Sequence, residues 1–221
     1  CDSRGMSQEV PTLSVTQIQQ ATSRSGAATG AAHACSLGAD GRYFSALCKD
    51  PAAEYALRKL DKRAVMAELL DDDSRPTTLK QRFCAAGKTL LRVSHLRQHD
   101  INPQIVRALA DAVKTTLQKS DLVIFSDFNY GVLSEKLVSR MMTAARTHNI
   151  VIAADSQSSS QMGDITKFQG VDILTPTERE ARLATRNKNG GLVTVAEELE
   201  TLTDAKTIVL TLGEEGLFAR A

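Results

Sequence analysis

The chain has 221 residues, of which 42% are hydrophobic and 24% are charged, a composition typical of a globular protein with one sizeable domain. Its 27 basic residues nearly balance its 26 acidic ones, and the net charge of +1 excludes a broad field that would hold nucleic acid or an anionic membrane. The longest apolar stretches, such as residues 150–154, are far shorter than the ~20 residues of a membrane-spanning helix.

The cysteines are Cys1, Cys35, Cys48 and Cys84. They show neither C-x-x-C spacing nor the density of a secreted disulfide scaffold, which favours thiols kept reduced in a cytoplasm. No signal-peptide pattern opens the chain, which begins at Cys1 rather than Met. We therefore expect a cytoplasmic protein with no membrane or nucleic-acid partner.

Two elements are predicted in the first part of the chain. Residues 9–18 carry the apolar residues Val10, Leu13, Val15 and Ile18 and predict a further strand of the small sheet to which residues 77–94 also belong. Residues 27–37 are rich in Ala and Gly and predict a helix whose small side chains permit a close approach to a larger sheet.

Residues 77–94 predict a hairpin with one basic face, because polar and apolar residues alternate in both halves. The side chains on that face are Thr78, Lys80, Arg82, Arg92 and Ser94. A guanidinium forks onto phosphate oxygens and a lysine adds a point charge, so this face is suited to a sugar phosphate. A charged face that is only solvated is the alternative. His95 and His99 follow one helical turn apart, which predicts a surface helix rather than a metal site.

The second half of the chain alternates strand and helix patterns. The predicted strands are residues 121–126, 150–154, 171–174 and 207–210. The predicted helices are 103–117 after an Asn102 cap, 134–149, 178–185 and 195–202. Apolar strands that alternate with helices imply a parallel sheet covered on both faces, and hence an α/β fold.

Polar residues stand where these strands end, namely Asp127, Asp155, Thr175 and Thr211. Open parallel sheets bind ligands outside the carboxyl ends of their strands, so these positions predict a ligand edge. The alternative is that each residue simply begins a loop.

Residues 211–216 read Thr-Leu-Gly-Glu-Glu-Gly and offer a hydroxyl and two glycines, Gly213 and Gly216, to phosphate oxygens. They lack the lysine of a P-loop, and a plain hairpin turn is the alternative. Thr177 and Glu180 fit a capping box, and Glu180 could also face a hydrated magnesium ion. The capping box and a contact between Glu180 and magnesium are compatible.

The order of these motifs resembles the ribokinase-like (PfkB) carbohydrate kinases, and within them the heptose-7-phosphate kinase branch, often half of a bifunctional kinase and nucleotidyltransferase. The more branch-specific stretches are Arg-Pro-Thr-Thr-x-Lys-x-Arg at residues 75–82 and Ser-Asp-Phe-Asn-Tyr-Gly-Val-Leu at residues 126–133. The other matching stretches are residues 5–11, 25–30, 36–39, 88–94, 174–180 and 211–216.

The resemblance implies a three-layer α/β/α sandwich with a mostly parallel sheet and a small β lid that covers the sugar and often pairs subunits into a homodimer. Residues 1–221 would form one partial kinase domain. Its lid strands would be about 9–18 and 77–94, and its α/β core about 25–70 and 102–221.

The resemblance also implies the site. The residues expected near the sugar are Gly26, Ala27, Lys80, Arg82 and Asp127. Those expected near the nucleotide are Asp155, Thr177, Glu180, Thr211, Gly213 and Gly216, with Glu180 reaching magnesium through water. The reaction would transfer the γ-phosphoryl group of ATP, with Mg²⁺, to a hydroxyl of a sugar phosphate, mainly through positioning and charge neutralisation.

Several departures from the family pattern leave alternatives open. Ser25 replaces the first glycine of a Gly-Gly pair, Thr177 replaces Asn, and Asp155 begins Asp-Ser-Gln rather than Asp-Pro-Lys. The Gly-Ala-Gly-Asp segment with the catalytic base is absent before Ala221, so we expect a domain truncated at both ends. The alternative is a non-catalytic sugar- or nucleotide-binding module partnering a nucleotidyltransferase. A dinucleotide-dependent oxidoreductase is disfavoured because no G-x-G-x-x-G is found.

Overall fold

The computed structural model describes residues 2–6, 13–16, 26–85, 88–157 and 164–221. The predicted strand 9–18 lies only partly within them. Its described part is β2 (Leu13–Thr16), which pairs antiparallel with β1 (Asp2–Met6). Among the described residues this pair is a two-stranded sheet separate from the hairpin of residues 79–95, so the prediction that both belong to one small sheet is wrong. Residues 9–12 and 17–18 of the predicted strand, and the family-like residues 7–11 and 25, fall outside the described residues.

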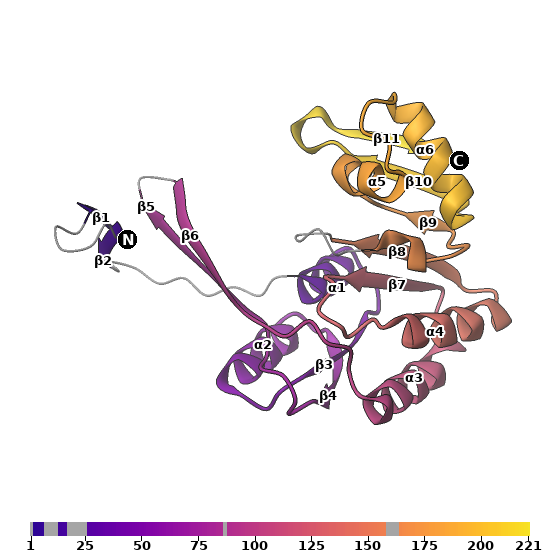
Figure 1. Ribbon diagram of the computed structural model, residues 1–221. Coiled ribbons are helices and arrows are strands. Elements are labelled where there is room, and N and C mark those ends of the chain that lie inside the picture. Colours follow the sequence, from indigo (N-terminus) through magenta and orange to yellow (C-terminus); the bar gives the residue numbers. More distant parts are fainter. Residues whose placement is uncertain (1, 7–12, 17–25, 86–87, 158–163) are drawn as a thin grey trace.

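A five-stranded sheet forms the centre of the molecule (Figure 1), in the order β11-β10-β9-β8-β7. Its parallel strands are β7 (Leu122–Asp127), β8 (Val151–Ser156), β9 (Ile173–Leu174) and β10 (Thr207–Thr211). The last strand, β11 (Leu217–Arg220), returns antiparallel to β10. The predicted α/β fold with a mostly parallel sheet is confirmed.

Helices join these strands, and two of them begin at the predicted caps Asn102 and Thr177, whereas the last begins three residues before its predicted start, after Gly191 and without a side-chain cap. They are α3 (Pro103–Leu117), α4 (Glu135–Thr147), α5 (Glu178–Thr185) and α6 (Leu192–Thr203), with short 3-10 turns η1 (Ile165–Lys167) and η2 (Gly213–Glu215). The Asn102 side chain accepts hydrogen bonds from the amides of Gln104 and Ile105, which fixes the start of α3. The Ser134 side chain caps α4 in the same way.

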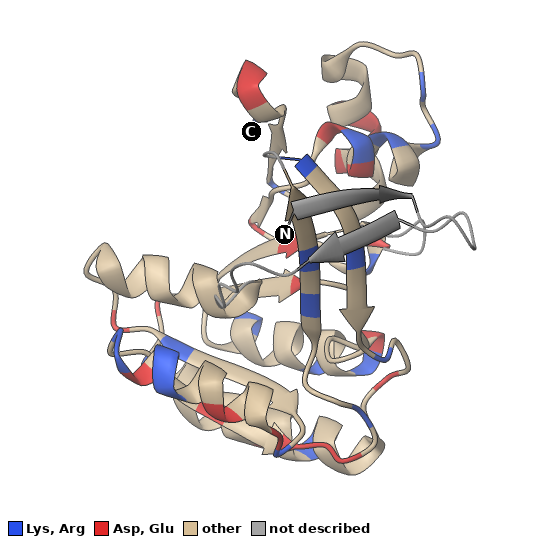
Figure 2. Ribbon diagram, turned by 90° about the vertical axis from the view of Figure 1, so that its left-hand side faces the viewer, with Lys and Arg blue, Asp and Glu red and all other residues tan. Residues whose placement is uncertain are grey.

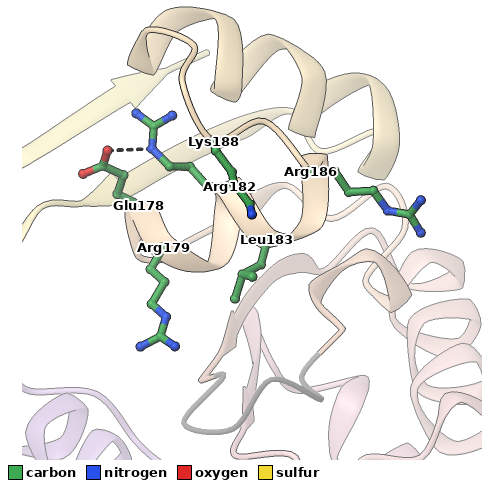
Figure 3. Close-up of a pocket in the computed structure, with 6 residues that line it drawn as sticks. All are labelled: Glu178, Arg179, Arg182, Leu183, Arg186 and Lys188. Atoms are coloured by element: carbon green, nitrogen blue, oxygen red, sulfur yellow. Dashed lines mark hydrogen bonds and ion pairs between the residues drawn. The ribbon is translucent and has the colours of Figure 1, made fainter.

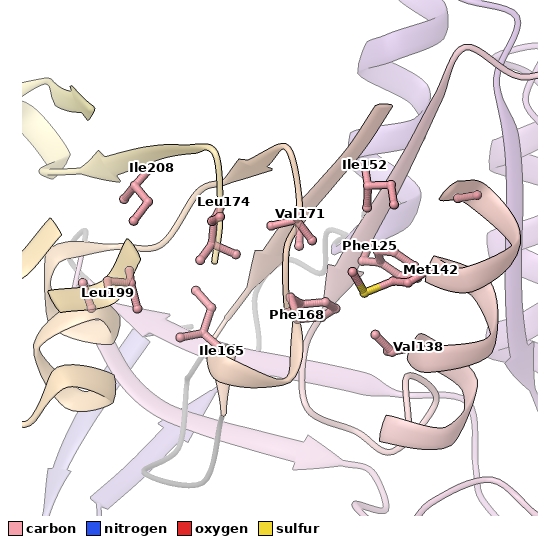
Figure 4. Close-up of a cluster of buried hydrophobic side chains, with 14 of the residues drawn as sticks. Phe125, Val138, Met142, Ile152, Ile165, Phe168, Val171, Leu174, Leu199 and Ile208 are labelled. Carbon is pink, nitrogen blue, oxygen red and sulfur yellow. The ribbon is translucent and has the colours of Figure 1, made fainter. Parts of the chain in front are cut away.

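The main core lies between one face of this sheet and the helices (Figure 4). Phe125, Ile152, Leu174 and Ile208 come from four neighbouring strands and are buried together against residues of α4, η1 and α6. Phe125 and Phe168 lie with ring centroids 5.7 Å apart. This packing holds the strands in place, so that their carboxyl ends lie along one edge of the sheet.

The opposite face of β7 and β8 is apolar but exposed among the described residues. Leu122, Ile124 and Val151 are 47%, 57% and 44% exposed. They share one face, because residues two apart on a strand point the same way and Leu122 is the register partner of Val151. The second helical layer is therefore thin in the described structure, where α1 (Ala27–Ser36) lies against β7.

Residues 42–71 form a unit that the sequence patterns left without assigned elements. Strands β3 (Arg42–Leu47) and β4 (Met66–Asp71) are parallel and are joined by α2 (Pro51–Asp61). The Asp50 carboxylate caps α2 by accepting from the Ala53 amide, and its second oxygen accepts from the Thr77 amide. Asp50 thus connects α2 to the segment that leads into the hairpin.

The predicted hairpin consists of β5 (Leu79–Ala85) and β6 (Lys88–His95) and extends away from the sheet (Figure 1). Arg82 lies opposite Arg92 and Lys80 lies opposite Ser94, so these residues share one face of the hairpin, as predicted. Basic residues mark both strands in Figure 2.

The prediction of a surface helix at His95 and His99 is wrong. His95 ends β6, with its ring 3.0 Å from the Gln81 side chain, and His99 lies in the following loop. Cross-strand pairing extends to His95, so this residue belongs to β6. The next helix begins only after the Asn102 cap. In the part of the chain that the structure describes, no helix is long and apolar enough to cross a membrane.

Candidate functional site

Three carboxylates gather at the carboxyl edge of the sheet. Asp127 ends β7, Asp155 lies next to it near the end of β8, and Glu180 stands in the first turn of α5 after β9. Burial raises the pKa of Asp155, and the negative charges of Glu180 and Asp127 raise it further. The strand-end argument thus correctly placed Asp127 and Asp155 at one edge of the sheet. Glu180, which that argument did not include, lies near Asp155 at the same edge.

The Asp127 carboxylate is buried and held on both oxygens. One oxygen accepts from the Asn129 amide at 2.9 Å, and the other pairs with the ammonium of Lys167. Lys167 also donates to the Leu133 carbonyl at 3.1 Å. Sequence reasoning missed Lys167, because no spacing rule relates Asp127 to a lysine in a 3-10 turn 40 positions later.

Glu180 and Thr177 form the predicted capping box, which is confirmed. A Glu180 oxygen accepts from both the amide and the hydroxyl of Thr177 at 2.8 Å, and the Glu180 amide donates to the Thr177 hydroxyl at 3.2 Å. These bonds hold the buried Glu180 side chain at the rim. The cap is compatible with a contact to hydrated magnesium, which stays a prediction.

Thr211 lies beside this cap at the end of β10. It forms a parallel bridge with Thr177, and its amide donates to the Pro176 carbonyl at 2.9 Å. Gly213 and Gly216 follow in the exposed turn that leads to β11, with φ of +65° and +99°. A Cβ at either glycine would meet no atom within 4 Å, so positive φ rather than crowding favours glycine there. The turn is a hairpin connection, and its phosphate-binding role stays a prediction.

The start of α1 and the hairpin meet next to Asp127. Gly26 has a φ of +71°, and a Cβ there would lie 3.0 Å from the ring of Phe128. The Lys80 ammonium lies 5.8 Å from the centroid of the same ring and 5.1 Å from that of Tyr130. Gly26, Ala27 at the first position of α1, and Lys80 are thus brought to the loop after β7.

Arg82 lies farther out on the hairpin and is exposed, as is Arg92 opposite it. Neither guanidinium forms a hydrogen bond or ion pair within the described residues. Like charges placed directly opposite each other on a hairpin are destabilising. An anion between the two side chains would remove that cost.

A buried ion pair that sequence reasoning missed anchors the hairpin. The Arg75 guanidinium lies 2.6 Å from the Asp72 carboxylate and donates to the carbonyls of Tyr130 and His99, both at 2.6 Å. Both charged side chains are almost fully buried. Arg75 therefore connects both legs of the hairpin to the loop that carries Phe128.

The donor chemistry of the rim is suited to magnesium. No three His, Cys, Asp or Glu side chains lie close enough to chelate a bare ion, within the ranges that the structure describes. Magnesium prefers oxygen ligands and keeps several waters, so carboxylates that reach it through water are sufficient. Asp155 and Glu180 meet that requirement, and ATP phosphates would complete the ligand set.

Comparison with known proteins identifies the family to which the chain is similar. A family model described as "pfkB family carbohydrate kinase" matches residues 6–220. The Bifunctional protein HldE of Bradyrhizobium diazoefficiens is 27% identical over 218 residues, 96% of this chain and 43% of that protein. The HldE of Helicobacter pylori is 30% identical over 152 residues, 67% of this chain and 32% of that protein. The chain thus spans less than half the length of these curated relatives.

Solved structures share the fold at low sequence identity. The structure titled "Crystal Structure of Sa239" has a TM-score of 0.79 and 16% identity, and the match covers 100% of this chain and 71% of that one. Phosphofructokinase-2 from Escherichia coli in complex with fructose-6-phosphate has a TM-score of 0.69 and 14% identity, covering 99% and 73%. Ribokinase from Giardia lamblia has a TM-score of 0.68 and 17% identity, covering 86% and 60%. The expected ribokinase-like fold is confirmed.

Proposed function

The chain belongs to the pfkB family of carbohydrate kinases, and we propose that it serves the transfer of the γ-phosphoryl group of ATP to a hydroxyl of a sugar phosphate. The observation that carries this proposal is the convergence of Asp127, Asp155 and Glu180 at one sheet edge, next to the loop that Lys80 contacts. Phosphoryl transfer depends mainly on positioning and on neutralising charge, which such a rim with magnesium provides.

On the sugar side, we assign binding to Gly26, Ala27, Lys80, Arg82 and Asp127. Asp127 would act on the sugar side by fixing the loop after β7, because its buried carboxylate accepts from the Asn129 amide and pairs with Lys167. The absence of a side chain on Gly26 leaves its backbone close to the Phe128 ring, at the base of the same loop.

On the nucleotide side, we assign binding to Asp155, Thr177, Glu180, Thr211, Gly213 and Gly216. The exposed turn after β10 would offer backbone amides to phosphate oxygens. Magnesium, when bound with ATP, would neutralise charge on the phosphates, and Glu180 would reach it through water. The capping box gives Glu180 a fixed position for that contact.

We further propose that the sugar is a heptose 7-phosphate. Two observations support this: the relatives named HldE, and the facing pair Arg82 and Arg92, which lacks a carboxylate partner within the described residues. A dianionic phosphate bridging two guanidinium groups would relieve their repulsion. A lid-mediated homodimer and a fused or partner nucleotidyltransferase domain belong to the same proposal.

The family's Gly-Ala-Gly-Asp segment does not occur in the 221 residues. We propose that no side chain of residues 1–221 acts as the general base. This chain then binds substrates but turns over ATP barely above background. A purely sugar- or nucleotide-binding module is the second candidate, favoured by the replacement of the family's usual Asn by Thr177. Turnover by a longer product of the same gene separates the two.

Calorimetry tests the proposed substrate. Heptose 7-phosphate is expected to bind about tenfold more tightly than the unphosphorylated heptose, a difference of about 1.4 kcal/mol. Arg82→Gln with Arg92→Gln should abolish that preference, whereas Arg97→Gln, an exposed arginine beyond the hairpin, should preserve it. Failure to bind either ATP or any phosphorylated sugar would overturn the kinase proposal.

A further inference from the structure

A hollow lies beside α5 (Figure 3), and none of the three rim carboxylates lines it. Its volume is about 470 Å³, and it is lined by Glu178, Arg179, Arg182, Leu183, Arg186 and Lys188. Glu180 on the same helix is buried and belongs to the cap. The hollow is therefore made by the exposed side of α5 and the segment that follows it.

One of its cations has a structural role. The Arg182 side chain pairs with Glu178 at 2.8 Å and donates to the carbonyls of Asn187 at 3.3 Å and Gly190 at 2.8 Å. These bonds fold residues 187–190 back against the helix. They also neutralise Glu178, so the hollow keeps an unbalanced positive charge.

The other three cations, Arg179, Arg186 and Lys188, are exposed. Across residues 26–85, 88–157 and 164–221, none of them forms a hydrogen bond or an ion pair. Leu183 lies between the two arginines in sequence and is 47% exposed. Figure 3 shows Arg179 and Arg186 extending from opposite ends of the helix, with Leu183 between them.

The distance between Arg179 and Arg186 indicates which shape of ligand could contact both. Seven residues separate Arg179 from Arg186, a rise of about 10 Å along a helix. Figure 3 shows the two guanidinium groups pointing in different directions from opposite ends of the helix, an arrangement that suits an extended chain with several carboxylates better than a single phosphate group. The exposed Leu183 between them would add an apolar contact.

We propose that this surface docks an acidic polypeptide segment that carries an apolar side chain between its carboxylates. The carboxylates would pair with Arg179, Arg186 and Lys188, and the apolar side chain would cover Leu183. Guanidinium groups suit this role, because they bind carboxylates in a forked geometry. The proposal does not depend on the kinase function.

The test uses a fluorescein-labelled synthetic peptide, Glu-Asp-Glu-Leu-Glu-Asp-Glu, and fluorescence anisotropy with the protein. Binding is expected to weaken as salt rises, and by about tenfold or more in the variant Arg179→Glu, Arg186→Glu, Lys188→Glu. Leu183→Asp should weaken it as well. Substitution of both arginines by lysine should retain part of the affinity, and unchanged thermal melting would verify that each variant folds.

The matched control lies on α3. Arg107 and Lys114 are exposed with the same seven-residue spacing, but Asp111 occupies the position that corresponds to Leu183. Arg107→Glu with Lys114→Glu should leave peptide binding unchanged. Three results would overturn the proposal: no peptide binding, equal loss in the α3 variant, or binding of tripolyphosphate but not peptide at α5. Self-association that the α5 variant abolishes, without peptide binding, would instead assign the surface to a second copy of the chain.

Discussion

The ammonium of Lys167 pairs with the buried carboxylate of Asp127 at the carboxyl edge of the sheet. We expect Lys167→Met to cost about 3 kcal/mol of unfolding free energy, because it leaves a buried carboxylate without its cation. Asp127→Asn in the same protein should recover most of that loss, since the uncompensated charge is then gone. Urea unfolding measures both effects, and equal stability of the single and double variants would contradict the explanation.

The raised pKa of Asp155 predicts a pH-dependent stability. A carboxyl group whose pKa is raised on folding holds its proton more tightly in the folded state. The destabilisation that the raised pKa causes is therefore absent below pH 3.8, the ordinary pKa of the group. It grows as the pH rises through the raised pKa. Asp155→Asn should stabilise the protein at pH 7 and have progressively less effect as the pH falls toward 4. Urea unfolding across this range checks it, and a pH-independent difference would argue against the electrostatic cause.

We expect Arg75 to hold the hairpin against the loop that carries Phe128. Arg75→Ala should cost about 3–5 kcal/mol, because Asp72 is left buried and two carbonyls lose their donor. Hydrogen exchange in residues 79–95 should accelerate more than exchange in the central sheet. Lys49→Ala, which removes an exposed ion pair with Asp71, serves as the control and should have little effect on stability, because solvent screens exposed pairs.

The capping box predicts a modest, local effect. Thr177→Val should destabilise the protein by about 1 kcal/mol, because it removes the oxygen that accepts from the Glu180 amide. Thr115→Val on the exposed surface of α3 should have a smaller effect. If Glu180 also serves magnesium, Thr177→Val should weaken magnesium-dependent ATP binding by calorimetry, whereas Thr115→Val should not. Equal ATP affinity in both variants would leave only the structural role.

The exposed apolar face of β7 and β8 predicts self-association of the chain. Leu122→Thr with Ile124→Thr should reduce it, because threonine keeps the strand propensity and removes apolar surface. Leu217→Thr on β11 removes an exposed leucine elsewhere and is the control. Light scattering over a range of concentrations measures the outcome. A wild-type chain that remains monomeric throughout would refute the prediction.

The sequence determined the elements whose signals are local. Asn102 and Ser134 begin helices because a side-chain oxygen satisfies nearby amides, and Thr177 and Glu180 form a cap for the same reason. The alternation in residues 77–94 was enough to place Arg82 and Arg92 on one face of the hairpin, while the structure shows that they pair directly. The strand-end rule was enough to bring Asp127 and Asp155 to one edge, because parallel strands end together.

Tertiary structure alone decided contacts between residues far apart in the chain. Lys167 meets Asp127, and Arg75 meets the carbonyls of His99 and Tyr130, through packing that no local spacing encodes. The strand β6 continued through His95, against the local helical spacing, because cross-strand pairing reaches that residue. Local hydrogen bonds and side-chain periodicity act over a few residues and can be read directly. Long-range ion pairs depend on how whole elements pack, which only the folded molecule specifies.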